Sequence, residues 1–130
     1  MKLDLIFTGV GGQGVVVLSD IFCEAALLDE FDVAKAEIHG MAQRGGSISA
    51  HVRIGDKVLS PLIERGKADV IVGFEVLETA RALPMMKAKG TVVVNTKYIP
   101  PTSLLQNLSK PLKLEDLIDL IRQKASASTR

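Results

Sequence analysis

The sequence has very little cysteine: Cys23 is the single one, and it lies in a strongly apolar segment. One thiol excludes an internal disulfide, and it also excludes an iron–sulfur cluster held by four thiolates of this chain. An inert buried thiol is the favoured interpretation of Cys23, ahead of a nucleophile. Because disulfides are absent, we expect a reducing compartment and therefore a cytoplasmic protein.

An excess of one charge and long apolar runs are lacking too. The 16 basic and 15 acidic side chains nearly cancel and are interspersed, so no electrostatic footprint for nucleic acid or an anionic membrane is present. The apolar run within residues 1–8 is too short for a signal peptide, and no stretch approaches the length of a membrane span. We expect neither nucleic acid nor a membrane among the partners.

Groups for metal binding or catalysis are sparse. His39 and His51 have no recognised metal-ligand spacing, and no cluster of Asp, Glu or Cys accompanies them. The serines lack a visible histidine–carboxylate partner or a G-x-S-x-G setting. The sequence therefore predicts no metal site and no catalytic residue in this chain. His51 is expected on the polar face of a strand, and His39, at a strand end beside a glycine, is the better candidate for touching a ligand.

What is present is the pattern of an α/β domain. Apolar runs and alternation predict strands at residues 2–8, 33–38, 47–54, 68–74 and 91–95, and helical periodicity predicts helices at 15–28, 76–83 and 113–125. Gly55-Asp56 predicts a hairpin turn from the third strand into Lys57–Ser60. We expect one domain over residues 1–125, with a frayed polar tail at 126–130. The predicted fold is a three-layer α/β/α sandwich with a mostly parallel, mixed sheet that includes one antiparallel hairpin.

A glycine cluster, Gly9–Gly14, follows the first predicted strand and satisfies G-x-G-x-x-G. In this context backbone N–H groups and a helix N-terminus can hold phosphate oxygens, although the pattern is common and a tight turn that binds nothing is the alternative. No Lys-Ser or Lys-Thr follows, which disfavours a nucleoside-triphosphate loop. A dinucleotide site would also need a carboxylate at the end of the second strand. Glu37 is the nearest fit, but it comes slightly late.

A second glycine-rich segment, His39–Gly46, lies between two predicted strands. Arg44 within it could bind a phosphate or carboxylate through two hydrogen bonds, and the alternative is a flexible crossover loop with a solvated Arg44. In open α/β sheets ligands gather at the carboxyl ends of the strands. Both glycine-rich loops are predicted to lie there.

The two segments Gly9–Gly14 and Gly40–Ser47, with the strand that follows the second, resemble the gamma domain of the pyruvate:ferredoxin oxidoreductase family, and most closely its separate small subunits of the indolepyruvate type. The pair occurs in the family's order and spacing, and Pro100–Ser103 also resembles it, so the likeness covers essentially the whole chain. Family members usually continue beyond the helix that matches Leu114–Ala125 with a further strand and helices. Without them, part of the sheet edge or of the partner surface is expected to be missing.

The resemblance implies a non-catalytic subunit of a complex that oxidatively decarboxylates a 2-oxoacid to an acyl-CoA and reduces ferredoxin. Thiamine diphosphate and iron–sulfur clusters would lie in the large catalytic partner subunit, and ferredoxin would interact through the complex. The two loops would form the face that meets the large subunit, and they would either contact coenzyme A or lie near the active-site entrance. The implied binding residues are Gly9, Gly11, Gly12, Gln13, Gly14, His39, Gly40, Met41, Gln43, Arg44, Gly45 and Gly46.

Two other functions stay open. The chain could be a free-standing nucleotide-binding or regulatory module of the Rossmann type. A fragment of an NAD-dependent dehydrogenase is disfavoured, because no second domain or catalytic group follows in the sequence. Co-purification with a partner would separate the subunit hypothesis from the free-standing module.

Overall fold

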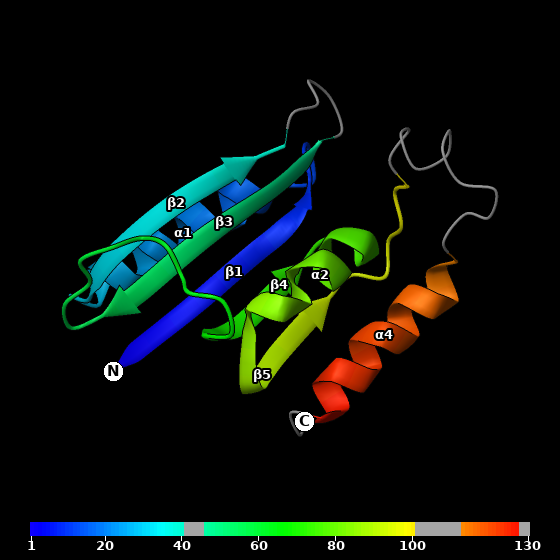
Figure 1. Cartoon of the computed structure of the whole chain (residues 1–130). Coiled ribbons are helices and arrows are strands. Elements are labelled where there is room, and N and C mark those ends of the chain that lie inside the picture. The colour runs from blue at the N-terminus through cyan, green and yellow to red at the C-terminus, as the bar shows by residue number, and fades with distance from the viewer. Residues whose placement is uncertain (41–45, 101–112, 128–130) are drawn as a thin grey trace.

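A computed structural model describes residues 1–40, 46–100 and 113–127, which form an α/β fold around a five-stranded sheet (Figure 1). The strands are β1 (Lys2–Val10), β2 (Asp32–His39), β3 (Ser47–Gly55), β4 (Ala68–Gly73) and β5 (Met86–Val94), in the order β2-β3-β1-β4-β5. β3 pairs antiparallel with both β1 and β2, whereas β4 pairs parallel with β1 and β5. Four strands therefore run in one direction and β3 in the other, which confirms the mostly parallel, mixed sheet.

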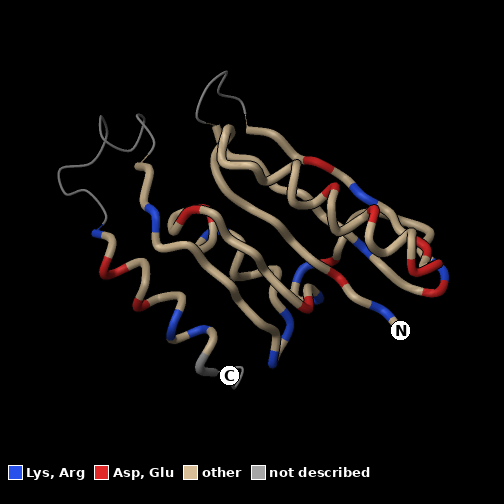
Figure 2. The backbone as a smooth tube through the Cα atoms, turned by 180° about the vertical axis from the view of Figure 1, so that it is seen from behind, with Lys and Arg blue, Asp and Glu red and all other residues tan. Residues whose placement is uncertain are grey.

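Helices cover the two faces of this sheet. α1 (Val15–Leu28) packs on β1, β2 and β3, and it lies behind the sheet in Figure 1. α2 (Val76–Ala82) and α4 (Leu114–Ala127) pack against each other and against β1, β4 and β5 on the opposite face. In Figure 2 the acidic residues at the start of α4 and the basic residues of its later turns are visible, an order that suits the helix dipole. The three expected layers are therefore confirmed.

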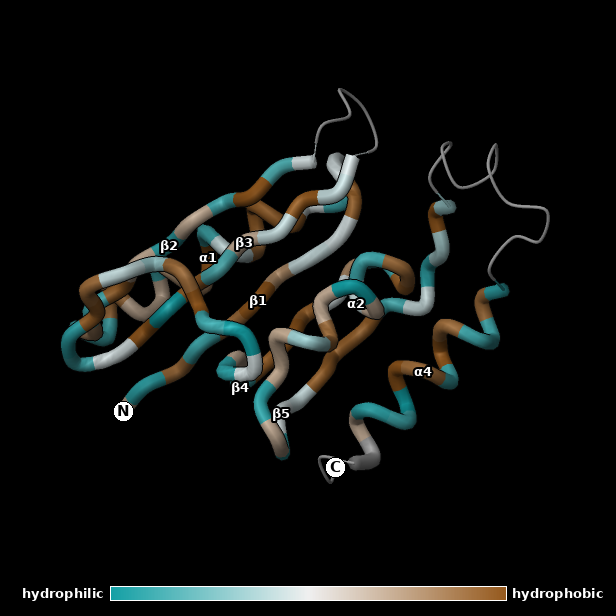
Figure 3. The backbone as a smooth tube through the Cα atoms, in the orientation of Figure 1, coloured by the Kyte–Doolittle hydropathy of each residue, from teal (hydrophilic) through white to brown (hydrophobic). Residues whose placement is uncertain are grey.

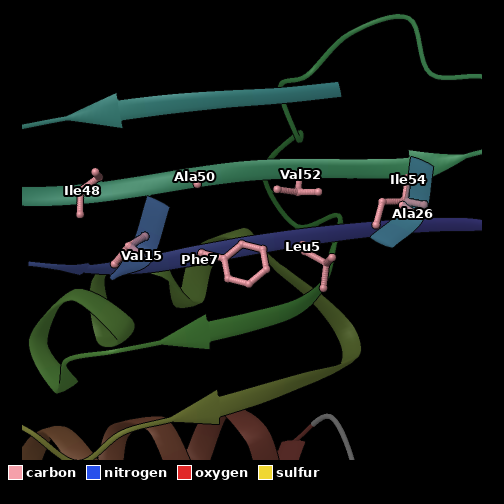
Figure 4. Close-up of a cluster of buried hydrophobic side chains, with 8 residues drawn as sticks. All are labelled: Leu5, Phe7, Val15, Ala26, Ile48, Ala50, Val52 and Ile54. Carbon is pink, nitrogen blue, oxygen red and sulfur yellow. The ribbon is translucent and has the colours of Figure 1, made fainter. Parts of the chain in front are cut away.

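The core follows from the alternation of the strands. Successive side chains of a strand point to opposite faces, so Leu5 and Phe7 point towards α1 while Ile6 contributes to the α2 side. The residues predicted to share one face of β3 are buried in the α1-side cluster (Figure 4): Ile48, Ala50, Val52 and Ile54. A further cluster joins Val76 and Leu77 of α2 to Leu117 and Ile121 of α4.

The predicted hairpin between the third strand and Lys57–Ser60 is wrong. Both edges of β3 are already paired, one with β1 and one with β2. The backbone beyond Gly55 therefore bonds to side chains: Val58 N–H donates to Asp32 Oδ2 at 2.8 Å, and the Ser60 carbonyl accepts from Arg53 Nη1 at 3.2 Å. The antiparallel hairpin of this fold is β2–β3.

Two boundaries also differ from the expectation. β5 begins at Met86, five residues before the predicted strand at 91–95. Its first half contains Lys87, Lys89 and Gly90, so it lacks the apolar pattern by which strands are predicted from sequence. Lysines are common on edge strands, where they disfavour pairing with a further strand, and β5 lies at the edge of the sheet. α4 continues to Ala127, two residues beyond the predicted end of the helix at residue 125. Residues 128–130 lie outside the described part of the chain.

Candidate functional site

The first glycine loop connects β1 to α1 at the carboxyl edge of the sheet. Gly12 and Gly14 have φ angles of +94° and +93°, a left-handed conformation that glycine adopts without steric cost. Gly9 is required for another reason: a Cβ there would lie 2.8 Å from Gln13 Oε1 and 2.9 Å from Phe74 Cβ. Local packing and backbone conformation therefore also account for glycine at these positions, apart from any phosphate binding.

Gln13 points into the fold and fastens this loop. Its Oε1 accepts the Val10 N–H at 2.8 Å, and its Nε2 donates to the Phe74 carbonyl at 3.0 Å. The side chain thus connects the end of β1 to the residue that follows β4. Among the predicted binding residues, Gln13 holds the loop in shape rather than extending towards an approaching ligand.

The second glycine-rich loop meets the first. Gly11 N–H donates to the Gly46 carbonyl at 2.9 Å, and Gly40 N–H donates to the Ser47 carbonyl at 2.7 Å. His39 ends β2 with an exposed side chain, and its Nε2 lies 3.3 Å from Glu37 Oε1. For the described residues, both loops therefore lie at the carboxyl edge as predicted, and the bond between them is an additional finding. Four predicted binding residues lie outside the described part of the chain: Met41, Gln43, Arg44 and Gly45.

A hollow of about 290 Å³ lies beside the first loop, and the residues that line it include Gly11, Gly12, Val17 and Ile48. No side chain caps the N-terminus of α1, and its first turn has no acidic residue. Unpaired N–H groups at a helix start favour a negative or carbonyl group. The described residues that line this hollow include no acid, base or nucleophile.

Glu37 is poorly placed for a dinucleotide site. It lies on β2, and β3 separates β2 from the glycine loop of β1, a distance of about 10 Å at the usual strand spacing. Its carboxylate pairs with Lys35 at 2.9 Å and also contacts His39. These contacts, Lys35 first, lower the pKa of Glu37 below its usual range. The geometry therefore weighs against the dehydrogenase-like alternative.

A second strand-to-helix turn lies at the same edge, and sequence reasoning missed it. Glu75 follows β4, is fully buried and caps α2, accepting the N–H groups of Glu78 at 2.8 Å and Ile99 at 2.9 Å. Gly73 lies directly against Thr79, where a Cβ would come within 1.7 Å of Thr79 Oγ1. An acidic cap followed three residues later by Glu was the available signal, since it resembles a capping box.

His51 lies on the predicted polar face of β3 but is only 7% exposed. Its Nδ1 accepts the Ile63 N–H at 3.2 Å, and burial lowers its pKa, so the imidazole is neutral at pH 7. With Glu78 and Arg81 it lines a polar pocket of about 150 Å³ beside α2. Burial raises the pKa of the Glu78 carboxyl.

Cys23 is half-buried in α1 and packs against the core, and desolvation raises the pKa of its thiol. This is the behaviour of an unreactive thiol. Within residues 1–40, 46–100 and 113–127, no group of three or more His, Cys, Asp or Glu side chains could hold a metal ion. Among the same residues no helix has the length and apolarity needed to cross a membrane.

Comparisons with known proteins give one family. Residues 4–127 match the family described as Pyruvate ferredoxin/flavodoxin oxidoreductase. The chain is 40% identical over 127 residues to indolepyruvate oxidoreductase subunit IorB of Methanothermobacter thermautotrophicus, covering 98% of this chain and 64% of that subunit. It is 42% identical over 123 residues to the subunit of that name in Archaeoglobus fulgidus, covering 95% and 61%. The chain spans less than two thirds of the length of these relatives.

Solved structures share the fold. Pyruvate oxidoreductase subunit PORC of Thermotoga maritima is similar with a TM-score of 0.62 at 22% identity, over 98% of this chain and 58% of that one. A 2-oxoglutarate:ferredoxin oxidoreductase of Magnetococcus marinus, solved with 2-oxoglutarate, coenzyme A and succinyl-CoA bound, is similar with a TM-score of 0.64 at 19% identity, over 77% of this chain and 18% of that one.

Proposed function

Because this chain belongs to the pyruvate ferredoxin/flavodoxin oxidoreductase family, we propose that it is the small subunit of a 2-oxoacid:ferredoxin oxidoreductase, most like the indolepyruvate type. The complex would convert a 2-oxoacid and coenzyme A to an acyl-CoA and reduce ferredoxin. Its thiamine diphosphate and iron–sulfur clusters would lie in the large partner subunit. The names of the relatives support the indolepyruvate assignment. Because it hands electrons to ferredoxin, we place the complex in the cytoplasm.

The observation on which this proposal rests is the contact between the two glycine loops. Gly11 N–H bonds to the Gly46 carbonyl at 2.9 Å, so two segments far apart in the sequence form one surface at the carboxyl edge. The hollow beside it is lined by backbone and aliphatic side chains, with no proton-transfer group. Such a surface suits contact with another polypeptide better than chemistry of its own.

Coenzyme A contact is part of the same proposal. The N-terminus of α1 is uncapped and free of acidic residues in its first turn, so it would favour a phosphate oxygen. Arg44 of the second loop would add a guanidinium. The Magnetococcus marinus enzyme of similar fold binds coenzyme A, which supports a role of this kind for the loop surface. The binding residues would be Gly11, Gly12 and Gly14 with Arg44, while Gly9 and Gln13 hold the loop.

Reconstitution tests the proposal. The chain is expressed alone and together with the large subunit of the same organism, and each preparation is assayed for iron and for ferredoxin reduction with indolepyruvate, pyruvate and coenzyme A. We expect the chain alone to be colourless, free of iron and inactive, and the co-expressed pair to co-purify and to turn over. Stoichiometric iron or turnover without a second polypeptide would contradict the subunit assignment.

A titration separates the remaining alternatives. Calorimetry with NAD, NADP and coenzyme A on the isolated chain should detect no micromolar binding of either dinucleotide, since Glu37 is engaged by Lys35 and lies a strand away. Micromolar binding of NAD that Glu37→Ala abolishes would favour the dehydrogenase-like function instead.

A further inference from the structure

The polar pocket beside α2 lies on the face of the sheet opposite to the hollow at the first glycine loop. Successive side chains of a strand point to opposite faces, so Ile48 lines the hollow on the α1 side while Ser49 lines the pocket on the α2 side. The pocket volume of about 150 Å³ equals that of about five water molecules in the liquid. We call it the His51 pocket, and its polar lining residues come from β1, β3 and α2: Thr8, Ser49, His51, Glu78 and Arg81.

The His51 pocket is open to solvent on one side. α2 packs on β1, β4 and β5, and Figure 3 shows no described helix in front of β2 and β3. The pocket therefore lies where the cover of α2 ends. Arg81 lies at this border, because its side chain is 52% exposed while that of Glu78 is 10% exposed. A small molecule or a side chain of a partner can enter from this side.

His51 contributes a hydrogen-bond donor that has no partner among the described residues. The residue is only 7% exposed, and its Nδ1 accepts the Ile63 N–H at 3.2 Å. A neutral imidazole that accepts through one nitrogen carries its proton on the other, so Nε2 is a donor. Within the described part of the chain, no fully buried polar side-chain atom lacks a partner. Nε2 therefore reaches the pocket instead of being sealed in the core.

Glu78 contributes the complementary acceptor. Its Oε1 accepts from Arg81 Nη1 at 3.0 Å, and none of the described residues donates to its Oε2. Oε2 reaches the pocket for the same reason as Nε2 of His51, because a sealed oxygen would need a partner. The two charges of the Glu78–Arg81 pair cancel, and His51 is neutral. The pocket therefore has no net charge at neutral pH.

The two hydroxyls of the pocket adjust to either kind of group. Thr8 Oγ1 lies 3.3 Å from Ser49 Oγ, and either atom can donate to the other. A hydroxyl has one proton and two lone pairs, so both retain capacity for a ligand. An uncharged group with a carbonyl oxygen and an N–H matches the whole set. A carboxylate would instead lie beside the Glu78 carboxylate, with no unpaired cation to neutralise it.

We propose that the His51 pocket binds an uncharged carboxamide, whose carbonyl oxygen accepts from His51 Nε2–H and whose N–H donates to Glu78. The carboxamide belongs either to a small molecule or to an Asn or Gln side chain of a partner polypeptide, and the recognition chemistry is the same. Buried polar groups with unmade hydrogen bonds are unfavourable, and a ligand of this kind satisfies them. The site is separate from the two glycine loops and does not depend on the proposed function.

Titration of the full 130-residue chain with acetamide and with acetate tests the proposal. The two probes have the same shape, but only acetamide is neutral and carries N–H donors. The ¹³C-labelled methyl group of Met85, which lines the pocket, reports binding by NMR and is assigned with Met85→Leu. At neutral pH we expect a saturable shift at millimolar acetamide, because so small a ligand makes few contacts. The Kd of acetate should be at least about tenfold higher.

Glu78→Gln should reverse this preference. Glutamine keeps an oxygen for Arg81 but turns an N–H towards the pocket, and the guanidinium charge is left uncompensated. Acetamide should bind about tenfold more weakly than to the parent, and acetate more tightly. The matched control is Glu115→Gln, the same change at an exposed position of α4, which should alter neither affinity.

His51→Phe removes the donor and should abolish acetamide binding. Circular dichroism checks that each variant is folded, and Glu78→Gln decides the matter if His51→Phe is not. No saturable shift of Met85 with acetamide would show that the pocket holds water only and would overturn the proposal. Acetate binding to the parent as tightly as acetamide, or a preference that Glu78→Gln leaves unchanged, would overturn it too.

The same titration on the complex with the large subunit identifies the source of the carboxamide. A Met85 signal that moves to its acetamide-bound position on assembly, and no longer responds to acetamide, indicates an Asn or Gln side chain of the large subunit. A signal that still responds indicates a small-molecule carboxamide. This second measurement rests on the proposed function, whereas the titration of the chain alone decides whether the pocket binds a carboxamide.

Discussion

The two strand-to-helix turns at the carboxyl edge of the sheet are built in opposite ways. Between β1 and α1, two glycines adopt positive φ, no side chain caps the helix, and a hollow lies open beside the loop. Between β4 and α2, the fully buried Glu75 caps the helix and also holds the segment at Ile99. The first turn leaves backbone groups available to a partner, whereas the second uses its polar groups inside the protein. The proposed function therefore expects contact with other molecules at the first turn and a structural role for the second.

Removing the buried cap should have the largest effect on stability. Glu75→Ala leaves the buried Glu78 N–H and the partly buried Ile99 N–H without an acceptor and should lower the free energy of unfolding by about 2–4 kcal/mol. Glu75→Gln keeps one carbonyl oxygen and should cost less. Urea unfolding measures both, with Glu64→Ala at an exposed position as the control. A loss below about 0.5 kcal/mol for Glu75→Ala, the range of surface changes, would contradict the structural role of this turn.

Glycine substitutions compare the two turns directly. Gly73→Ala would force a Cβ to within 1.7 Å of Thr79 Oγ1 and should cost about 1–3 kcal/mol through overpacking. Thr79→Ala in the same chain should recover part of that loss. The Cβ that Gly11→Ala adds would meet only the Gly46 carbonyl, at 3.7 Å. This substitution should change the free energy of unfolding by less than about 0.5 kcal/mol. Thermal unfolding measures the loss of stability for each variant. Equal losses at Gly73 and Gly11 would show that the first turn is as tightly packed as the second.

The pH dependence of stability should report the buried side of α2. His51 has a folded pKa below its usual value because of burial, so the unfolded chain binds a proton more readily. The contribution of neutral His51 to the free energy of unfolding should be full above about pH 6.5, and it should be lost as the pH falls towards the lower folded pKa. The free energy of unfolding, measured at several pH values between pH 8 and pH 5, should therefore change less with pH for His51→Gln than for the parent. The same dependence on pH in both proteins would show that His51 does not contribute to the pH dependence of stability.

Arg44 should have the smallest effect on stability. Arg44→Ala is expected to change the free energy of unfolding by no more than about 0.5 kcal/mol, yet to lower assembly or activity of the complex. Chemical unfolding and an assembly assay on the same preparations measure the two effects. A large loss of stability with normal activity would show that Arg44 has a structural role.

Local patterns in the sequence predicted most elements of the fold. The bounds of α1 were predicted at both ends, because a glycine loop precedes it and its apolar spacing is helical. The strict alternation of 47–54 identified β3 and its buried face. Partner choice is not local, however: Gly55-Asp56 has the sequence of a hairpin turn, but β1 and β2 already occupy both edges of β3.

The candidate site was predicted in outline for the same reason. Glycine spacing located the first loop, but it did not distinguish glycines needed for packing, such as Gly9, from those that leave the backbone accessible. Glycine spacing also did not reveal that Gln13, a predicted binding residue, bonds to the Val10 N–H and the Phe74 carbonyl. Glu75 was missed because one acidic residue after a strand does not reveal burial, which depends on the distant segment at Ile99.

The affinity of the large subunit for two variants of this chain tests the division between the turns most directly. Gly11 lies outside the left-handed region, and a Cβ there would meet only the Gly46 carbonyl at 3.7 Å. Gly11→Leu should therefore keep the thermal midpoint of the parent while lowering the affinity for the large subunit by about tenfold or more. Glu75→Gln should lower the midpoint and leave the affinity of the folded protein unchanged. An unchanged affinity for Gly11→Leu, or a lost affinity for folded Glu75→Gln, would contradict the account.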